Sequence, residues 1–344
     1  MKKMTSLVSI VFALSVVLFS ACRKDGKPFK NPEEMVAVAN RGGGSISFID
    51  AKKNTVINTL PIAGSEPMYV VYVPSKDKLY VGDRAQNKIH VINPQTKTVE
   101  RSIDGGKGIF HMWADGQGKQ LWVSNDIDLS VSVIDLSANA VVKTINTGLK
   151  PHDVFLTADG SKAFVSILSG DAATPDKIYM YSTKTFAKTG ETSVGKDPHL
   201  FHLPAANKLY VPCQSGQLYT LNGSNLSLIS NNPFTGAHGI FPSPDQSNIF
   251  VTNISGAQLY SIRAANSTLN EPAVSTINPT PHNIVVNLDG NKMFVTHSGA
   301  TANTVSTYTI TNGKIATGTT ITIGTNPFGL AYYKRETNSQ PVKY

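Results

Sequence analysis

A pattern of two short strands joined by a turn recurs along the chain and constrains its fold more than any other feature. One copy, residues 151–167, reads Pro-His-Asp-Val-Phe-Leu-Thr-Ala-Asp-Gly-Ser-Lys-Ala-Phe-Val-Ser-Ile. It begins as a strand, turns at Asp159-Gly160 and continues as a second strand. The histidines that open successive copies are 41, 47, 39 and 44 residues apart. A period of about 40–45 residues with four strands per repeat is typical of a β-propeller blade.

The remaining strands indicate how the ring of blades closes. Short alternating segments such as residues 69–73 and 88–92 predict strands, and no segment shows a sustained helical period. Six complete repeats run from about residue 66 to 325. Three N-terminal strands within 35–60 and one C-terminal strand at 327–333 supply a seventh blade, with the C-terminal strand innermost. We therefore predict an all-β fold, a seven-bladed β-propeller over residues 35–335.

The N-terminus has the features of an export signal. Met1-Lys2-Lys3 precedes an apolar run over residues 7–19, which is shorter than the roughly 20 residues that span a bilayer. The following Ser20-Ala21-Cys22 resembles a bacterial lipobox, which implies that Cys22 receives a lipid. We expect a lipoprotein signal peptide at 1–21, a flexible tether at 22–34 and a polar tail at 336–344. No acidic run follows Cys22, which favours a lipid-anchored outer-membrane protein of the cell envelope that faces the periplasm.

Cysteine usage and charge limit the partners. Besides Cys22 the chain has only Cys213, so the exported domain cannot form an internal disulfide. The formal net charge is +8, but the lysines are scattered among turns rather than gathered in a basic stripe. We expect a monomer that does not bind nucleic acid.

The start of the innermost strand predicts a ring of side chains at one mouth of the central channel. We place seven residues there, one from each blade: Met68, His111, His152, His199, His238, His282 and Phe328. The spacing to the second strand is 10 residues for His111 and His199 and 11 for four of the others. Five imidazoles would then surround the channel.

The second strand of each blade ends on the same face, and its last residues are expected to stand behind the ring. These residues are Asn40, Asp83, Asn125, Ile167, Cys213, Asn253 and His297. Asp153 follows His152 directly, so strand alternation predicts that it points away from the channel. The predicted ligand-binding residues are Met68, Asp83, His111, Asn125, His152, His199, Cys213, His238, Asn253, His282 and His297. The predicted metal ligands are His152, His199, His238 and His282, with copper or zinc as the metal.

Three segments resemble the repeat of YVTN-type seven-bladed propellers: Phe250-Val251-Thr252-Asn253, Trp122-Val123-Ser124-Asn125 and Phe294-Val295-Thr296-His297. The group resembled includes bacterial surface proteins, nitrite and nitrous-oxide reductase propellers, and lactonases. In nitrous-oxide reductases a histidine-lined channel holds a copper cluster. Phe328 cannot be a ligand, so the resemblance implies a mononuclear or dinuclear site and not a complete seven-histidine cluster.

Three functions remain open from the sequence. The channel binds a ligand such as a transition metal; or the rim is a scaffold for an envelope protein or polysaccharide; or the channel serves a lactonase-like or redox enzyme. The chain contains no Gly-x-Ser-x-Gly, His-Glu-x-x-His or Cys-x-x-Cys motif, so we predict no catalytic residues.

Overall fold

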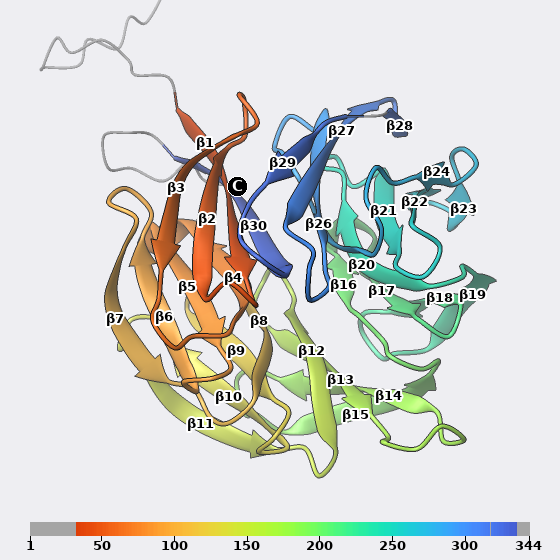
Figure 1. Cartoon of the computed structure of the whole chain (residues 1–344). Coiled ribbons are helices and arrows are strands. Elements are labelled where there is room, and N and C mark those ends of the chain that lie inside the picture. The colour runs from red at the N-terminus through yellow and green to blue at the C-terminus, as the bar shows by residue number, and fades with distance from the viewer. Residues whose placement is uncertain (1–31, 317, 336–344) are drawn as a thin grey trace, which may run out of the picture. The chain divides into compact units, whose positions relative to one another are not determined.

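The computed structural model describes residues 32–316 and 318–335, and these residues form seven antiparallel sheets. Each sheet is one blade, and Figure 1 shows the blades arranged around a central axis. The inner strands of neighbouring blades lie side by side, for example β4 (Pro67–Val73) beside β8 (Ile109–Ala114). The prediction of an all-β seven-bladed propeller is confirmed.

The first six blades follow one another along the chain, and each begins with its innermost strand. Blade 1 comprises β4, β5 (Lys78–Asp83), β6 (Lys88–Asn93) and β7 (Thr98–Asp104). Blade 2 comprises β8, β9 (Gln120–Asn125), β10 (Ser130–Asp135) and β11 (Ala140–Asn146). Blade 3 comprises β12 (Lys150–Leu156), β13 (Lys162–Leu168), β14 (Asp176–Ser182) and β15 (Lys188–Val194).

The next three blades vary more in their outer strands. Blade 4 comprises β16 (Phe201–Leu203), β17 (Lys208–Cys213), β18 (Gln217–Asn222) and β19 (Leu228–Pro233). Blade 5 comprises β20 (Ala237–Pro242), β21 (Asn248–Asn253), β22 (Gln258–Arg263), β23 (Thr268–Leu269) and β24 (Val274–Ser275). Blade 6 comprises β25 (Pro281–Val286), β26 (Lys292–His297), β27 (Thr304–Thr311), β28 (Lys314–Ala316) and β29 (Thr320–Thr322). Short 3-10 helices, η1 (Pro74–Lys76) and η2 (Pro204–Ala206), follow two of the inner strands.

The closing blade joins both ends of the described chain. Its strand order is β3 (Thr55–Pro61), β2 (Ser45–Asp50), β1 (Glu33–Asn40) and β30 (Pro327–Arg335), as predicted, with the C-terminal strand innermost. Figure 1 shows the blue β30 beside the red-orange β1. The Arg335 guanidinium, which is 2% exposed, donates to Asp77 Oδ1 and Oδ2 at 3.1 and 2.9 Å and to Glu33 Oε2 at 3.1 Å. This guanidinium fastens the last strand to blade 1 and to the first strand.

The repeated Asp and Asn residues form hydrogen bonds that stabilise the blades. At the end of β10 the Asp135 Oδ1 accepts the backbone N–H groups of Ser137 and Ala138 at 2.7 and 2.8 Å. That Asx turn brings the chain into the outermost strand. The Asn125 Nδ2 donates to Ser132 Oγ at 2.8 Å and so links the second strand to the third. These contacts account for the recurring Asn and Val-Ser-Val-Ile-Asp without any ligand.

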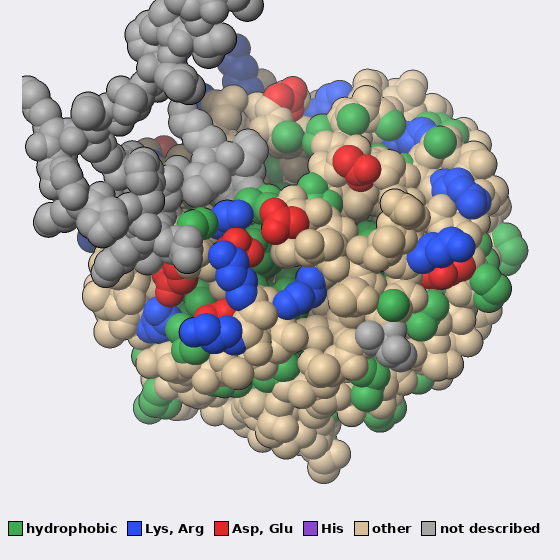
Figure 2. Space-filling model, turned by 90° about the horizontal axis from the view of Figure 1, so that it is seen from above, with side chains coloured by type: hydrophobic (Ala, Val, Ile, Leu, Met, Phe, Trp, Pro, Cys, Tyr) green, Lys and Arg blue, Asp and Glu red, His purple; other side chains and the backbone are tan. Residues whose placement is uncertain are grey.

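Charged side chains of both signs are mixed on the surface. Figure 2 shows one face, on which several Lys and Arg side chains lie next to Asp and Glu side chains. Such mixing is typical of a solvated surface.

The predicted signal peptide, Cys22, most of the tether and the polar tail lie outside the described residues. The strand β1 begins at Glu33, so the described domain starts two residues before the predicted boundary. Within 32–316 and 318–335, no helix combines the length and the apolar character that crossing a membrane would require.

Candidate functional site

A β-bulge at the start of the inner strand determines which side chains reach the mouth of the channel. In blade 3, Pro151 pairs with Ile167 while Val154 pairs with Val165, so His152 and Asp153 together occupy the place of one residue. The same register shift occurs in blades 1, 2, 5 and 6. A bulge interrupts strand alternation and re-aims side chains. Two residues from each of these blades therefore reach the region of the mouth.

The bulge corrects the prediction for His111, which is not in the same ring as the other histidines. In blade 2, Ile109 pairs with Asn125, as Pro151 pairs with Ile167 in blade 3. Phe110 therefore takes the ring position and stacks on the His152 imidazole with ring centroids 4.4 Å apart. His111 is at the second position of the bulge, one residue further along its strand. The spacing from His111 to the second strand is therefore one residue shorter than that from His152.

His199 keeps the ring position although blade 4 lacks the bulge. The pairing of Phe201 with Tyr210 continues to the bridge between Pro198 and Cys213 without a shift. The His199 imidazole is centred 4.9 Å from that of His152 and 3.8 Å from that of His238. The spacing from His199 to its second strand is shorter for a different reason: blade 4 lacks the extra residue that forms the bulge in the other blades.

Four histidines form a continuous arc at the mouth. Beyond His199, the imidazole centroids of His238 and His282 are 4.5 Å apart, and His282 is 4.1 Å from the Phe328 ring. All four are at most 9% exposed. The structure therefore brings the four predicted metal ligands, His152, His199, His238 and His282, into one contiguous group, although a ring of five imidazoles does not form.

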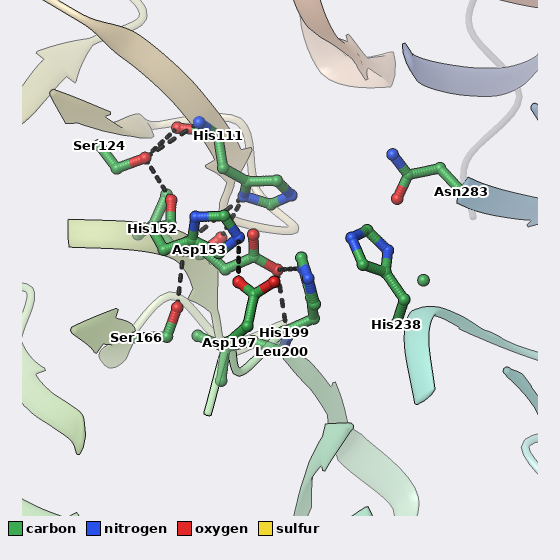
Figure 3. Close-up of polar contacts among 12 residues, drawn as sticks. His111, Ser124, His152, Asp153, Ser166, Asp197, His199, Leu200, His238 and Asn283 are labelled. Carbon is green, nitrogen blue, oxygen red and sulfur yellow. Dashed lines mark hydrogen bonds and ion pairs between the residues drawn. The ribbon is translucent and has the colours of Figure 1, made fainter. Parts of the chain in front are cut away.

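Asp153 belongs to this group, and the prediction that it points away from the channel is wrong. Its Oδ2 lies 3.2 Å from His199 Nδ1 and accepts the backbone N–H of Leu200 at 3.2 Å. The side chain is buried, and Figure 3 shows it between His152 and His199. Alternation failed here because Asp153 is the second residue of the bulge.

A second carboxylate, Asp197, reaches the same mouth from the loop between β15 and β16. Its Oδ1 lies 3.2 Å from His152 Nε2 (Figure 3). Asp197 has a left-handed backbone with φ of 54°, and its N–H donates to Asp176 Oδ2 at 2.8 Å. The neighbouring Lys196 Nζ donates to Asp176 Oδ1 at 2.6 Å. These bonds fix Asp197, which sequence analysis did not identify because only the loop conformation brings it to the ring.

Hydroxyl groups from the second strands hold the bulges and tie adjacent blades together. Ser124 Oγ accepts the backbone N–H of His111 at 2.9 Å and donates to the carbonyl oxygen of His152, in the next blade, at 2.6 Å. Ser166 Oγ accepts the N–H of Asp153 at 2.8 Å. Ser124 and Ser166 thus position the site residues.

Burial keeps most of the arc neutral. Desolvation lowers the pKa of His152 to about 4 and that of His282 to about 3, and it holds the pKa of His238 well below its usual value. The neutral His238 ring donates its Nδ1–H to the carbonyl oxygen of His282 at 3.3 Å, which leaves Nε2 as an acceptor. Neutral imidazoles are the form that binds metal ions.

Asp153 and His199 form a charged pair within this neutral arc. Burial opposes the charge of His199, but the carboxylates of Asp153 and Asp197 outweigh burial and raise the pKa of His199. Burial likewise opposes the charge of Asp153, but His111, His199 and His152 together hold its pKa well below the usual range. Below pH 6.5 the pair is therefore a carboxylate and an imidazolium.

Three buried atoms of this group have no hydrogen-bond partner among the described residues. They are His152 Nε2, Asp153 Oδ1 and His199 Nε2. His152 Nε2 is near Asp197 but is not aligned for a hydrogen bond, so we treat that contact as electrostatic only. Each of His152, Asp153 and His199 offers a ligand atom, and these atoms all lie within 4.8 Å of one another. Buried polar groups are seldom left unpaired, so this convergence indicates a place for an ion or water.

A small cavity of about 60 Å³ lies along the channel behind the mouth. Its polar lining includes Tyr69, His111, Asp153, His199 and Asn283. His111 Nδ1 is 3.1 Å from the carbonyl oxygen of Val154, and Asn283 Nδ2 donates to Tyr69 Oη at 3.2 Å. The cavity has room for ordered water next to the unpaired carboxylate oxygen.

Other predicted ligand residues make contacts inside their blades. Asp83 Oδ2 lies 3.0 Å from His90 Nε2. Both nitrogens of His297 are engaged, Nδ1 with the Pro279 carbonyl at 2.8 Å and Nε2 with Ser306 Oγ at 2.9 Å. These side chains support the blades rather than the arc.

Asn253, Met68 and Cys213 also do not join the histidine arc. Asn253 Nδ2 donates to Tyr260 Oη at 2.9 Å, as the Asn125 amide does to Ser132. Met68 has the predicted ring position in blade 1, since Pro67 pairs with Asp83 and Val70 with Val81, but its side chain is fully buried in an apolar cluster that extends into blade 2. Burial raises the pKa of the Cys213 thiol, so the metal-binding thiolate form is disfavoured.

Comparison with known proteins supports the fold and leaves the family open. No protein-family model matches the chain, so the YVTN resemblance stays a prediction. The uncharacterized protein YwhL of Bacillus subtilis is 26% identical over 272 residues, which cover 65% of this chain and 58% of that protein. The chain thus spans little more than half the length of this relative.

Solved structures show the same architecture at low sequence identity. Hydrazine synthase of Kuenenia stuttgartiensis matches with a TM-score of 0.68 at 13% identity, over 82% of this chain and 96% of that chain. A functionally unknown protein of Desulfotomaculum acetoxidans matches with a TM-score of 0.55 at 15% identity, over 84% of this chain and 80% of that one. At these identities the likeness extends to the propeller fold, which hosts many unrelated activities.

Proposed function

We propose that this propeller is a binding protein that holds one divalent transition metal ion, zinc or copper, at the channel mouth. The ligands are His152, Asp153 and His199. The observation that carries the proposal is that each of these three side chains has a buried polar atom without a hydrogen-bond partner among the described residues.

The donor set fits such an ion. Two imidazoles and one carboxylate are the ligand types that zinc takes in sites with an open fourth position, and imidazole also suits copper. Two ligand atoms bound to one zinc at about 2.0–2.2 Å are roughly 3.4 Å apart in tetrahedral geometry. One ligand atom from each of the three side chains already lies within 4.8 Å of those of the other two, so the three side chains are close enough to share one ion.

Neighbouring groups supply the second layer of such a site. The imidazole of His238, centred 3.8 Å from that of His199, is neutral and offers its Nε2. Asp197, next to His152, adds negative charge that favours a cation. Partners that orient ligand side chains are a regular part of protein metal sites.

The envelope location is part of the same proposal and is supported by the N-terminal sequence alone. An exported lipoprotein would meet zinc and copper outside the cytoplasm. Mass spectrometry of the mature N-terminus tests this part separately: a diacylated Cys22 at the first position supports it, and an unprocessed Met1 contradicts it.

The metal content of the purified chain tests the site. We expect about one zinc or copper ion per chain after loading with either salt and desalting, measured by plasma mass spectrometry without a histidine tag. Replacing His152 and His199 with Ala should remove the ion. His202→Gln is the matched control, because His202 bonds to Asn207 within its own blade and not to the arc. A chain that retains no metal overturns the proposal and directs attention to partners on the propeller rim.

A further inference from the structure

The opposite mouth of the channel is an apolar pocket. Beyond the bulges the inner strands run along the channel and end at hairpin turns, and these turns rim a cavity of about 420 Å³. Cavities of this size fall within the usual range for small-molecule pockets.

Four consecutive blades place an aromatic ring at the same position of the inner strand. These residues, Trp113, Phe155, Phe201 and Phe241, line the pocket and are called the aromatic arc. Trp113 stacks on Phe155 with ring centroids 4.2 Å apart, and the next pairs along the arc are 4.7 and 5.5 Å apart. Val71 and Val285 occupy the corresponding positions of blades 1 and 6.

The pocket carries almost no charge. Asp115 is the one Asp, Glu, Lys or Arg side chain among the described residues that line it. Its oxygens already accept the backbone N–H groups of Gln117, Lys119 and Gln120. An anionic ligand would therefore lose its hydration without gaining a partner, and the engaged carboxylate of Asp115 is not free to form an ion pair with a cation. The aromatic arc instead offers the flat faces and edges of its rings, which favour stacking with another ring.

We propose that the aromatic arc and the opposing valines bind an uncharged, flat, ring-containing small molecule. The site is separate from the metal site and does not depend on it, since none of the three metal ligands lines this pocket. Burial of apolar ring surface supplies the affinity.

The probe for the test is N-phenyl-1-naphthylamine, an uncharged aromatic compound whose emission rises in apolar surroundings. The full chain carrying Cys22→Ser is titrated, so that a lipid cannot bind the probe. We expect saturable binding of one probe per chain. The anionic analogue 1-anilinonaphthalene-8-sulfonate should bind roughly tenfold more weakly, because its sulfonate finds no partner. Equal or tighter binding of the anion overturns the proposal, as does unsaturable binding.

Variants locate the probe. Trp113→Ala combined with Phe241→Ala should weaken binding roughly tenfold, since each stacking contact contributes about 0.5–1.5 kcal/mol. Val71→Trp fills the pocket without removing the aromatic arc and should weaken probe binding at least as much. If the double variant fails to fold, the result with Val71→Trp tests the proposal. The control is Val142→Ala, which removes the same kind of surface from an exposed outer strand and should leave affinity unchanged. Unchanged affinity in Val71→Trp overturns the site.

A further experiment tests whether a terminal segment of the chain itself fills the pocket. The chain is also titrated after deletion of residues 1–31 and 336–344. Equal affinity in both forms supports an external ligand. Binding that appears only after the deletion shows that a terminal segment fills the pocket and overturns the proposal.

Discussion

Asp153 Oδ2 lies 3.2 Å from His199 Nδ1, and this contact joins the inner strand of blade 3 to the start of blade 4. Both side chains are buried, and the carboxylate of Asp153 favours the protonated form of His199, whose pKa is raised. A buried charge that loses its partner is costly, so the two residues depend on each other. The pair also presents two of the three proposed metal ligands together.

Asp153→Asn should lower the pKa of His199 below 6.5, because burial then acts on the imidazole with less opposition. The loss should also destabilise the fold by about 3 kcal/mol. NMR titration of the histidine ring and urea unfolding measure the two effects. Asp197→Asn is the matched control: its carboxylate is 34% exposed, so its loss should change stability much less. A His199 pKa that stays above 6.5 in Asp153→Asn would contradict the assignment.

Metal binding should strengthen as the pH rises through the pKa of His199. The raised pKa means that His199 carries a proton at pH 6, and the ion must displace it. His152, with a pKa of about 4, is already neutral there and adds no pH dependence. Competition titrations with a zinc indicator between pH 6 and 9 should show release of one proton per ion up to the His199 pKa and none above it. Affinity that does not change over this interval argues against His199 as a ligand.

The metal-free protein should lose stability on acidification from about pH 6.5 to 4. The folded-state pKa values of His152 and His282, about 4 and 3, are below the unfolded value of 6.5. In that interval the unfolded chain binds protons that the folded chain does not, so stability falls as pH falls, by on the order of 3 kcal/mol for His152 alone. The raised pKa of His199 acts in the opposite direction, since its contribution is present below pH 6.5 and is lost above its folded pKa.

Urea midpoints at pH 7, 5.5 and 4.5 in the presence of a chelator measure the net effect. His282→Gln removes one neutral imidazole, so the urea midpoint of this variant should change less with pH. Equal midpoints at the three pH values would mean that the arc takes up protons without unfolding, contrary to this prediction.

Arg335→Ala should destabilise the propeller by about 3 kcal/mol, because the substitution leaves Asp77 and Glu33 without their common partner. The expected result is a lower urea midpoint and earlier proteolysis at β30. The control is Lys88→Ala, which breaks an ion pair with the largely exposed Asp104 and should cost at most about 1 kcal/mol. Similar losses in both variants would show that the Arg335 contacts do not lock the ring.

The periodic pattern of the sequence was sufficient to predict the blades, because hydrophobic alternation and turn residues are local signals. The same logic predicted the closure of the ring, since an unpaired N-terminal set of three strands requires a fourth. The four histidines of the arc were found because each lies at or just before the start of an inner strand, as at His238 and His282, and inner strands meet at the channel.

The bulges could not be predicted from local signals. Each depends on bonds to distant residues, such as the one from Ser124 Oγ to the His152 carbonyl of the next blade. The shorter spacing at His111 was the one trace of the bulge in the sequence, and it was ambiguous, since the same spacing at His199 has another cause. Sequence periodicity thus determined the propeller and the position of its histidines. Tertiary structure decided which of them share the ring and added Asp153 and Asp197, because register and loop conformation depend on contacts between blades.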